Sequence, residues 1–101
     1  MGRRNYEAAA GEFSQVLEID GSHTGALLQR ARARGRMDDV VAIRDYDSAL
    51  DLDPDYDEPW LYRGIGKFRL GDPEGACADW HRALELGHEL AQGLIDDMCG
   101  E

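Results

Sequence analysis

Residues 13–20 of the chain read Phe-Ser-Gln-Val-Leu-Glu-Ile-Asp, residues 46–53 read Tyr-Asp-Ser-Ala-Leu-Asp-Leu-Asp, and residues 80–87 read Trp-His-Arg-Ala-Leu-Glu-Leu-Gly. The aromatic residues that open these segments are 33 and then 34 positions apart. Leucines at positions 17, 50 and 84 and alanines at positions 9, 42 and 76 keep the same two spacings. Because one register aligns several columns, we infer that the chain is built from repeated units.

The apolar residues inside each unit have the spacing of an α-helix. In the second copy, Ala42, Tyr46, Ala49 and Leu50 fall on one broad helix face. Glycine or proline interrupts the pattern at positions 21, 54, 71, 73 and 87. The pattern therefore predicts helices and no strands. Six helices are expected, near residues 5–19, 24–36, 39–52, 58–70, 73–86 and 88–98.

The best copy of the repeat contains Trp60-Leu61-Tyr62-Arg63-Gly64, then Leu70-Gly71-Asp72, Ala76 and Trp80. This pattern resembles the tetratricopeptide repeat, a helix–turn–helix unit of 34 residues. The resemblance implies an all-α fold of the tetratricopeptide-repeat-like α-solenoid class. Such a fold is a right-handed superhelical array of antiparallel helix pairs, here with about two and a half repeats and a C-terminal capping helix.

We expect one domain over residues 1–101. Its parts would be the second helix of an incomplete first repeat (1–21), two repeats (22–54 and 55–87) and a capping helix (88–101). The first repeat lacks its first helix, so Ala9, Phe13 and Val16 should face a helix that this sequence does not contain. Three interpretations remain: the chain is a fragment of a longer repeat protein, a partner or a second copy covers this face by assembly, or the face stays exposed.

The overall charge narrows the classes of partner. The chain carries 11 basic and 21 acidic residues, which gives a formal net charge of −10 at pH 7. This balance argues against nucleic acid and against an anionic membrane surface, because both require clustered cations. No window approaches 18 consecutive apolar residues. We therefore expect an acidic, cytoplasmic protein with no nucleic-acid or membrane partner.

Residues that could support catalysis or bind a metal do not have the required spacing. The aspartates at 51, 53, 55 and 57 lack the Gly and Glu that a calcium loop needs at its sixth and twelfth positions. The Gly64-Ile65-Gly66-Lys67 segment lacks the spacing of a phosphate-binding loop. The histidines at 23, 81 and 88 form no pair with ligand spacing. We expect no enzymatic activity, no cofactor and no metal.

The two cysteines lie in different predicted helices. Cys77 is near the start of one helix and Cys99 follows the end of the next, so antiparallel packing would bring them together. Two reduced, half-buried thiols are the usual state inside cells, where disulfides are uncommon. A disulfide is the alternative, and a Cα separation above about 7 Å would exclude it.

The resemblance also implies a binding surface, because in this family the first helix of each unit lines a concave groove for peptides or protein segments. On the two complete first helices we expect the groove to be lined by Leu28, Gln29, Arg32, Arg36, Leu61, Tyr62, Ile65 and Arg69. Arginine pairs well with carboxylates, and Tyr62 and Ile65 offer apolar contact. We therefore expect a protein or peptide partner with an acidic residue or a free C-terminal carboxylate.

Two alternatives remain open. The arginines at 30, 32, 34 and 36 could merely solvate a helix and offset neighbouring aspartates, and the domain could be purely architectural, serving the assembly of a larger repeat protein. Chaperone-binding members of the family use a two-carboxylate clamp of Lys, Arg and Asn. This chain lacks those Asn residues and has Tyr62 and Ile65 at matching places, so the clamp's specificity is not carried over.

Overall fold

The fold consists of consecutive helices that turn back on one another. The computed structural model describes residues 3–100 of the chain, and it describes side chains from residue 5 onward. The helices are α1 (Arg3–Ile19), α2 (Thr24–Gly35), α3 (Asp39–Leu52), α4 (Asp57–Arg69), α5 (Pro73–Glu85) and α6 (Ala91–Met98). The predicted all-α class is confirmed, and no strand occurs within residues 3–100.

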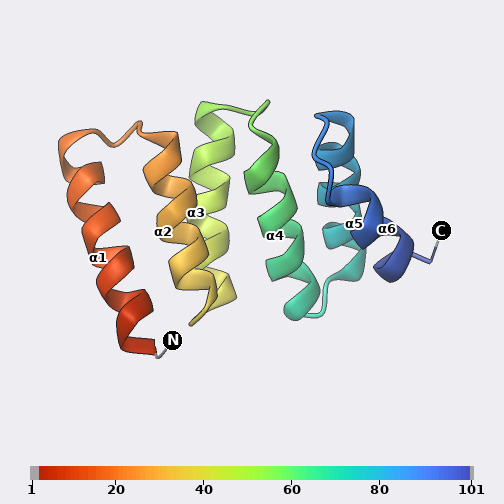
Figure 1. Cartoon of the computed structure of the whole chain (residues 1–101), viewed down its shortest axis with the longest axis horizontal. Helices are drawn as coiled ribbons and strands as arrows, with labels where there is room; N and C mark the ends of the chain where they lie inside the picture. Colours follow the sequence, from red (N-terminus) through yellow and green to blue (C-terminus); the bar gives the residue numbers. More distant parts are fainter. Residues whose placement is uncertain (1–2, 101) are drawn as a thin grey trace.

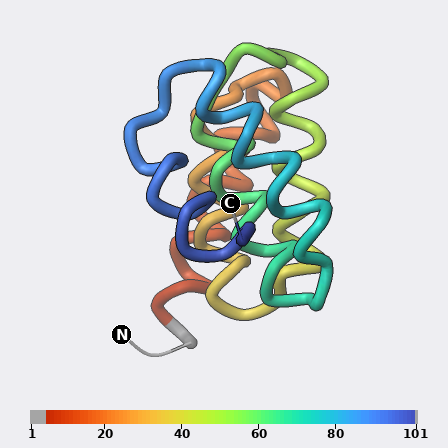
Figure 2. The backbone as a smooth tube through the Cα atoms, turned by 90° about the vertical axis from the view of Figure 1, so that its right-hand side faces the viewer, coloured from red at the N-terminus to blue at the C-terminus, as the bar shows by residue number. Residues whose placement is uncertain are grey.

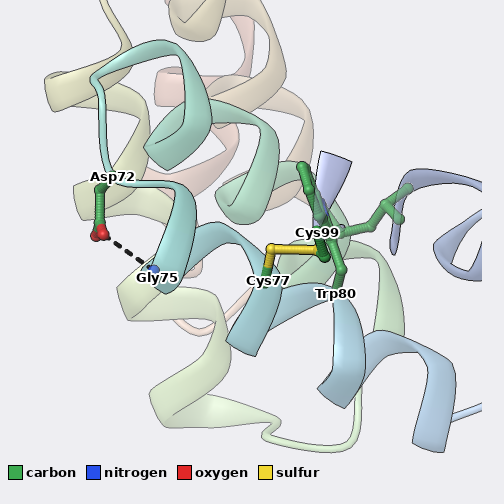
Figure 3. Close-up of a disulfide and its surroundings, with 6 residues drawn as sticks. Asp72, Gly75, Cys77, Trp80 and Cys99 are labelled. Atoms are coloured by element: carbon green, nitrogen blue, oxygen red, sulfur yellow. Dashed lines mark hydrogen bonds between the residues drawn. A yellow bond between two sulfur atoms is a disulfide. The ribbon is translucent and has the colours of Figure 1, made fainter. Parts of the chain in front are cut away.

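Short polar caps set where these helices start. Asp38 precedes α3, and its carboxylate accepts the backbone N–H groups of Val40 and Val41 at 3.0 and 3.4 Å. Asp72 does the same for α5 by accepting the N–H of Gly75 at 2.9 Å (Figure 3). These bonds satisfy N–H groups that have no partner within the helix. Helix α6 begins three residues later than the pattern predicts, because residues 89–90 form a turn instead.

The helices stack as antiparallel pairs along one direction (Figure 1). Each helix packs on the next one in the chain, and α2 also contacts α4. As a result α2 and α4 lie in one layer, with α3 and α5 in the other (Figure 2). The array measures 42 × 29 × 19 Å, and the first and last helices, α1 and α6, lie at opposite ends of its long axis. The layer of α2 and α4 holds the predicted groove residues.

Two apolar clusters fill the interior, one in each complete helix pair. The first contains Leu28, Ala31, Ala42 and Tyr46, and the second contains Leu61, Ala76, Trp80, Ala83, Ala91 and Ile95. Tyr46 on α3 and Trp80 on α5 therefore occupy corresponding places in successive pairs, as the repeat register predicts. Because each cluster is small, single residues in it have large effects on packing.

Gly64 permits the close contact between α4 and α5. The Trp80 indole N–H donates to the Leu61 carbonyl at 3.1 Å, and a Cβ added at Gly64 would lie 2.7 Å from Trp80 Cδ1 and 3.1 Å from the Ala76 carbonyl oxygen. We expect Gly64→Ala to lower the free energy of unfolding by about 1–3 kcal/mol through overpacking.

The matched control for this prediction is Gly11→Ala in α1, where an added Cβ meets nothing within 4 Å. That change should raise stability by about 0.5–1 kcal/mol, because glycine is a poor helix former. Urea denaturation followed by circular dichroism measures both variants. Equal stabilities of the two variants would contradict the close packing at Gly64.

A disulfide joins α5 to the end of α6. Cys77 and Cys99 are bonded, with their Cα atoms 5.9 Å apart, and Trp80 lies beside the bond (Figure 3). The interpretation of the cysteines as two reduced thiols is therefore wrong for this structure. The antiparallel turn brings the two residues together, as their positions in neighbouring helices allow. The bond holds the last helix onto the array.

Candidate functional site

The arginines of α2 alternate between two sides of the helix. Arg30 donates to both carboxylate oxygens of Asp45 at 2.7 and 2.8 Å, and Arg34 reaches the same carboxylate at 3.2 Å. Arg32 and Arg36 point elsewhere, into a cavity between the first helices. Residues two apart on a helix differ by about 200° in direction, which separates the two pairs. Arg30 and Arg34 thus offset a neighbouring aspartate, as the alternative interpretation of these arginines expected, and they are structural.

The next repeat reproduces this ion-pair arrangement. Arg63 donates to both oxygens of Asp79 at 2.9 Å, and Lys67 lies 3.2 Å from the same carboxylate. Burial lowers the pKa of Arg63, but its bonds to Asp79 and Asp47 outweigh this and raise the pKa above its ordinary value. These cations are thus committed to buried carboxylates and are not offered to a partner.

The cavity that contains Arg32 and Arg36 has a volume of about 190 Å³. It is lined by Arg32, Gly35, Arg36, Asp39, Tyr46, Tyr62, Ile65 and Arg69. We call it the arginine pocket. It brings together five of the residues predicted for the groove, which are Arg32, Arg36, Tyr62, Ile65 and Arg69.

Aromatic rings support the arginines of this pocket. The Arg32 guanidinium lies 4.5 Å from the centre of the Tyr62 ring, which is a cation–π distance. Tyr62 in turn stacks on Tyr46, with ring centres 6.5 Å apart. Arg69 reaches Asp39 at 3.2 Å. The stack holds the Arg32 side chain in place while its charged end stays exposed.

The arginine pocket is positively charged within a strongly acidic chain. Its lining includes three arginines against one carboxylate, Asp39, while the chain as a whole has a net charge of −10. Burial raises the pKa of Tyr46 well above its usual value, so this phenol stays neutral at physiological pH. Charge in the pocket therefore comes from the guanidinium groups, which pair well with carboxylates.

Two of the predicted groove residues belong to the core instead. Leu28 is 0% exposed and Leu61 is 1% exposed, so neither can contact a partner. The prediction was wrong because Leu28 shares a helix face with Ala31, one turn away, and that face packs on α3. Leu61 occupies the same place in the next repeat. Both leucines are buried because the second helix of each pair, α3 or α5, packs against their side of the first helix.

Gln29, also predicted for the groove, is partly exposed and does not line the arginine pocket. It lines a different cavity of about 340 Å³ together with Phe13, Val16, His23, Gly25 and Ala26. This cavity lies where α1 meets the start of α2. Two of its lining residues, Phe13 and Val16, belong to the predicted assembly face. Ala9 and Phe13 are half-buried, and Val16 is 38% exposed. An assembly role of this face stays a prediction.

Sequence reasoning missed Gly35, Asp39 and Tyr46 as pocket residues. Asp39 and Tyr46 lie on α3, the second helix of a pair, which was not expected to reach the groove. No spacing in the sequence shows that α3 would contribute to this pocket. The buried aspartates were not predicted either, but the repeat register carries a signal for them, since Asp45 and Asp79 are 34 positions apart and Arg30 and Arg63 are 33 apart.

Two kinds of alternative site are not found in the described part of the chain. Within residues 3–100, no group of three or more His, Cys, Asp or Glu side chains is placed to hold a metal ion. None of the helices described here combines the length and apolar character that crossing a membrane requires. The arginine pocket is therefore the site that we consider further.

Comparison with known proteins identifies what kind of domain this is. No family model matches the chain. The chain is 24% identical over 87 residues to the small glutamine-rich tetratricopeptide repeat-containing protein 2 of Saccharomyces cerevisiae, covering 85% of this chain and 25% of that protein. It thus spans about a quarter of the length of this curated relative.

A solved structure extends the likeness to the whole fold. The first tetratricopeptide repeat domain of Spaghetti (RPAP3), bound to the HSP90 peptide SRMEEVD, superposes with a TM-score of 0.89 at 25% identity. The match covers 95% of this chain and 79% of that one. Together with the repeat register and the stacked helix pairs, these likenesses show that the chain has the fold of a tetratricopeptide repeat domain.

Proposed function

We propose that this domain binds an acidic peptide or protein segment in the arginine pocket and catalyses no reaction. The observation that carries the proposal is the convergence of Arg32, Arg36 and Arg69 on one cavity beside the Tyr62 ring. Tetratricopeptide repeat domains are protein-interaction modules, and their stacked helices form concave binding surfaces. A carboxylate of the partner would accept hydrogen bonds from these guanidinium groups.

The structural neighbour supports the chemical class of the partner. Its peptide, SRMEEVD, has acidic side chains at three of seven positions. The present pocket differs from the two-carboxylate clamp because it contains arginines and tyrosines but no asparagine. We therefore propose acidic segments as the class of partner and not HSP90 in particular, and SRMEEVD serves below as a probe of this class. A cytoplasmic location stays a prediction.

Charge reversal at Arg32 tests the proposal. We expect Arg32→Glu to weaken binding of a fluorescein-labelled SRMEEVD peptide by about ten- to a hundredfold, because a charge-assisted hydrogen bond is replaced by repulsion. Fluorescence anisotropy at low salt measures the affinity. Added salt should weaken binding to the native chain, since these charges are exposed.

The matched control is Arg44→Glu, which makes the same charge change at an exposed position of α3 outside the arginine pocket. It should lower affinity by no more than about threefold, through the change in net charge alone. A second control is a peptide with Gln and Asn in place of its acidic residues, which should not bind. If Arg32→Glu and Arg44→Glu reduced affinity equally, the arginine pocket would not be the binding site.

An architectural role is the second candidate, and the α1 face favours it. Phe13 and Val16 line an open cavity, and Val16 is 38% exposed. Within residues 3–100, helix α1 packs mainly on α2 at one end of the array, so another unit could meet its outer side. Sedimentation velocity over a concentration series distinguishes the two roles. The sedimentation coefficient of a self-associating chain falls on dilution, whereas that of a monomeric peptide-binding domain stays constant.

A further inference from the structure

A second pocket adjoins the arginine pocket along the Ile65 and Arg69 side of α4. It has a volume of about 250 Å³ and is lined by Ile65, Phe68, Arg69, Trp80, Leu94 and Met98. We call it the apolar pocket. Ile65 and Arg69 line both pockets and lie one helical turn apart on α4. The two hollows are therefore neighbouring parts of one surface.

The apolar pocket presents large side chains to solvent. Phe68 is 39% exposed and Met98 is 44% exposed, although both lie beside the core residue Trp80. The Phe68 and Trp80 rings are 6.0 Å apart at their centres. Single exposed apolar residues are normal on protein surfaces, but a group of them around a hollow marks an interaction site.

The outer wall of the apolar pocket is held in place covalently. Leu94 and Met98 lie on α6, and Cys99, the next residue, is bonded to Cys77 of α5. Figure 3 shows this bond beside Trp80, which is itself 1% exposed. Because its wall cannot move far, the pocket exists before any ligand arrives, which lowers the cost of ordering on binding.

We propose that the apolar pocket is a second subsite, which takes an apolar side chain of the same acidic segment. This inference rests on the proposed function. Both pockets are smaller than the roughly 300–1,000 Å³ of typical small-molecule sites, so each suits a single side chain. Arg69 at the shared border favours a carboxylate close to that side chain, which is why an acidic segment is the occupant.

The width of α4 limits the spacing between the two groups of the ligand, because the two pockets share Ile65 and Arg69. A helix with its side chains is about 10 Å across, which is an upper limit for this spacing, and an extended peptide covers about 3.3–3.6 Å per residue. A leucine or methionine within about three residues of the bound carboxylate would therefore reach the apolar pocket. The partner is thus an acidic segment that carries a large apolar residue at this distance.

The experiment uses two sets of acidic, fluorescein-labelled peptides that end in a free C-terminal aspartate. One set has Leu two, three or four residues before the aspartate, and the other has Ser at the same place. We expect the best Leu peptide to bind the native chain about tenfold more tightly than its Ser partner. Met98→Ser and Phe68→Ser should each reduce this preference to about threefold or less.

Leu90→Ser is the matched control, since Leu90 precedes α6 and is 61% exposed but does not line the apolar pocket. It should leave the tenfold preference unchanged. Arg32→Glu should weaken both peptide sets by the same factor. A preference that survives in both Met98→Ser and Phe68→Ser would overturn the second subsite.

Two further results separate the inference from the proposed function. Equal affinity of the native chain for Leu and Ser peptides, with both weakened by Arg32→Glu, would reject the second subsite and leave the arginine pocket standing. If the native chain bound neither set, both the proposed function and the subsite would be wrong.

Discussion

Replacing Asp79 by alanine is expected to lower the free energy of unfolding by about 3–5 kcal/mol. Asp79 is 3% exposed. Its carboxylate accepts two hydrogen bonds from Arg63 and forms an ion pair with Lys67. Without the carboxylate, the Arg63 guanidinium would stay largely buried and lose its buried partner, because the Arg63 side chain is only 15% exposed. Asp47 would remain beside Arg63, but its side chain is half exposed and does not replace a buried carboxylate. Removing the buried partner of a buried charge is among the most destabilising changes a mutation can make.

Asp47→Ala is the control for this prediction, because it removes a different carboxylate from the same arginine. Asp47 contacts Arg63 at 2.7 Å, but its side chain is 53% exposed. Its loss should cost about 1 kcal/mol or less, as for other exposed ion pairs. Urea denaturation followed by circular dichroism measures both variants. If Asp47→Ala were as harmful as Asp79→Ala, burial would not be the cause.

The same prediction holds for Asp45 in the preceding repeat. Asp45 is 4% exposed and is bound by Arg30 and Arg34. Its bond to Arg30 raises the pKa of that guanidinium despite partial burial, so Arg30 stays charged. A repeated, buried ion pair of this kind joins the two helices of each pair at one defined register.

Removal of the disulfide by the double substitution Cys77→Ser and Cys99→Ser should lower the free energy of unfolding by about 3 kcal/mol. The bond closes a loop with a sequence separation of 22, and loss of this cross-link increases the entropy of the unfolded chain. Helix α6 should also open locally, because it packs mainly on α5 at one end of the array.

Two measurements check the disulfide prediction. Urea denaturation gives the loss of stability, and hydrogen exchange should show the largest gain in amide exchange in α6, with little change in α2 and α3. A thiol reductant should destabilise the native chain but not the double serine variant. Unchanged exchange in α6 would show that packing of Ala91 and Ile95 alone holds this helix.

The helices and their order could be predicted from the sequence because they depend on local chemistry. Apolar spacing, the glycines at 71 and 87, and the cap at Asp72 act within a few residues. The apolar spacing and the Asp cap also recur in the preceding repeat, where Asp38 caps α3. Both glycines adopt positive φ, which other residues rarely accept, so these two helix ends follow from residue type. Only α6 began later than predicted.

The candidate site was predictable in part. Arg32, Arg36, Tyr62, Ile65 and Arg69 meet in one pocket, because residues of α2 and α4 that are equivalent in the repeat face the same side. The burial of Leu28 and Leu61 was not predicted, and neither was the contribution of Tyr46 from α3.

The sequence by itself determined a stack of helix pairs, since the spacing of 33 and 34 residues repeats the same helical pattern. Only the tertiary structure decided which of the arginines at 30, 32, 34 and 36 are committed to Asp45 and which line the arginine pocket. The physical reason is that helical periodicity defines directions around one axis, whereas burial depends on which of those directions a neighbouring helix occupies. Around α2 these directions are occupied by α1, α3 and α4. Their contacts join residues that are distant in the sequence, so no local pattern predicts them.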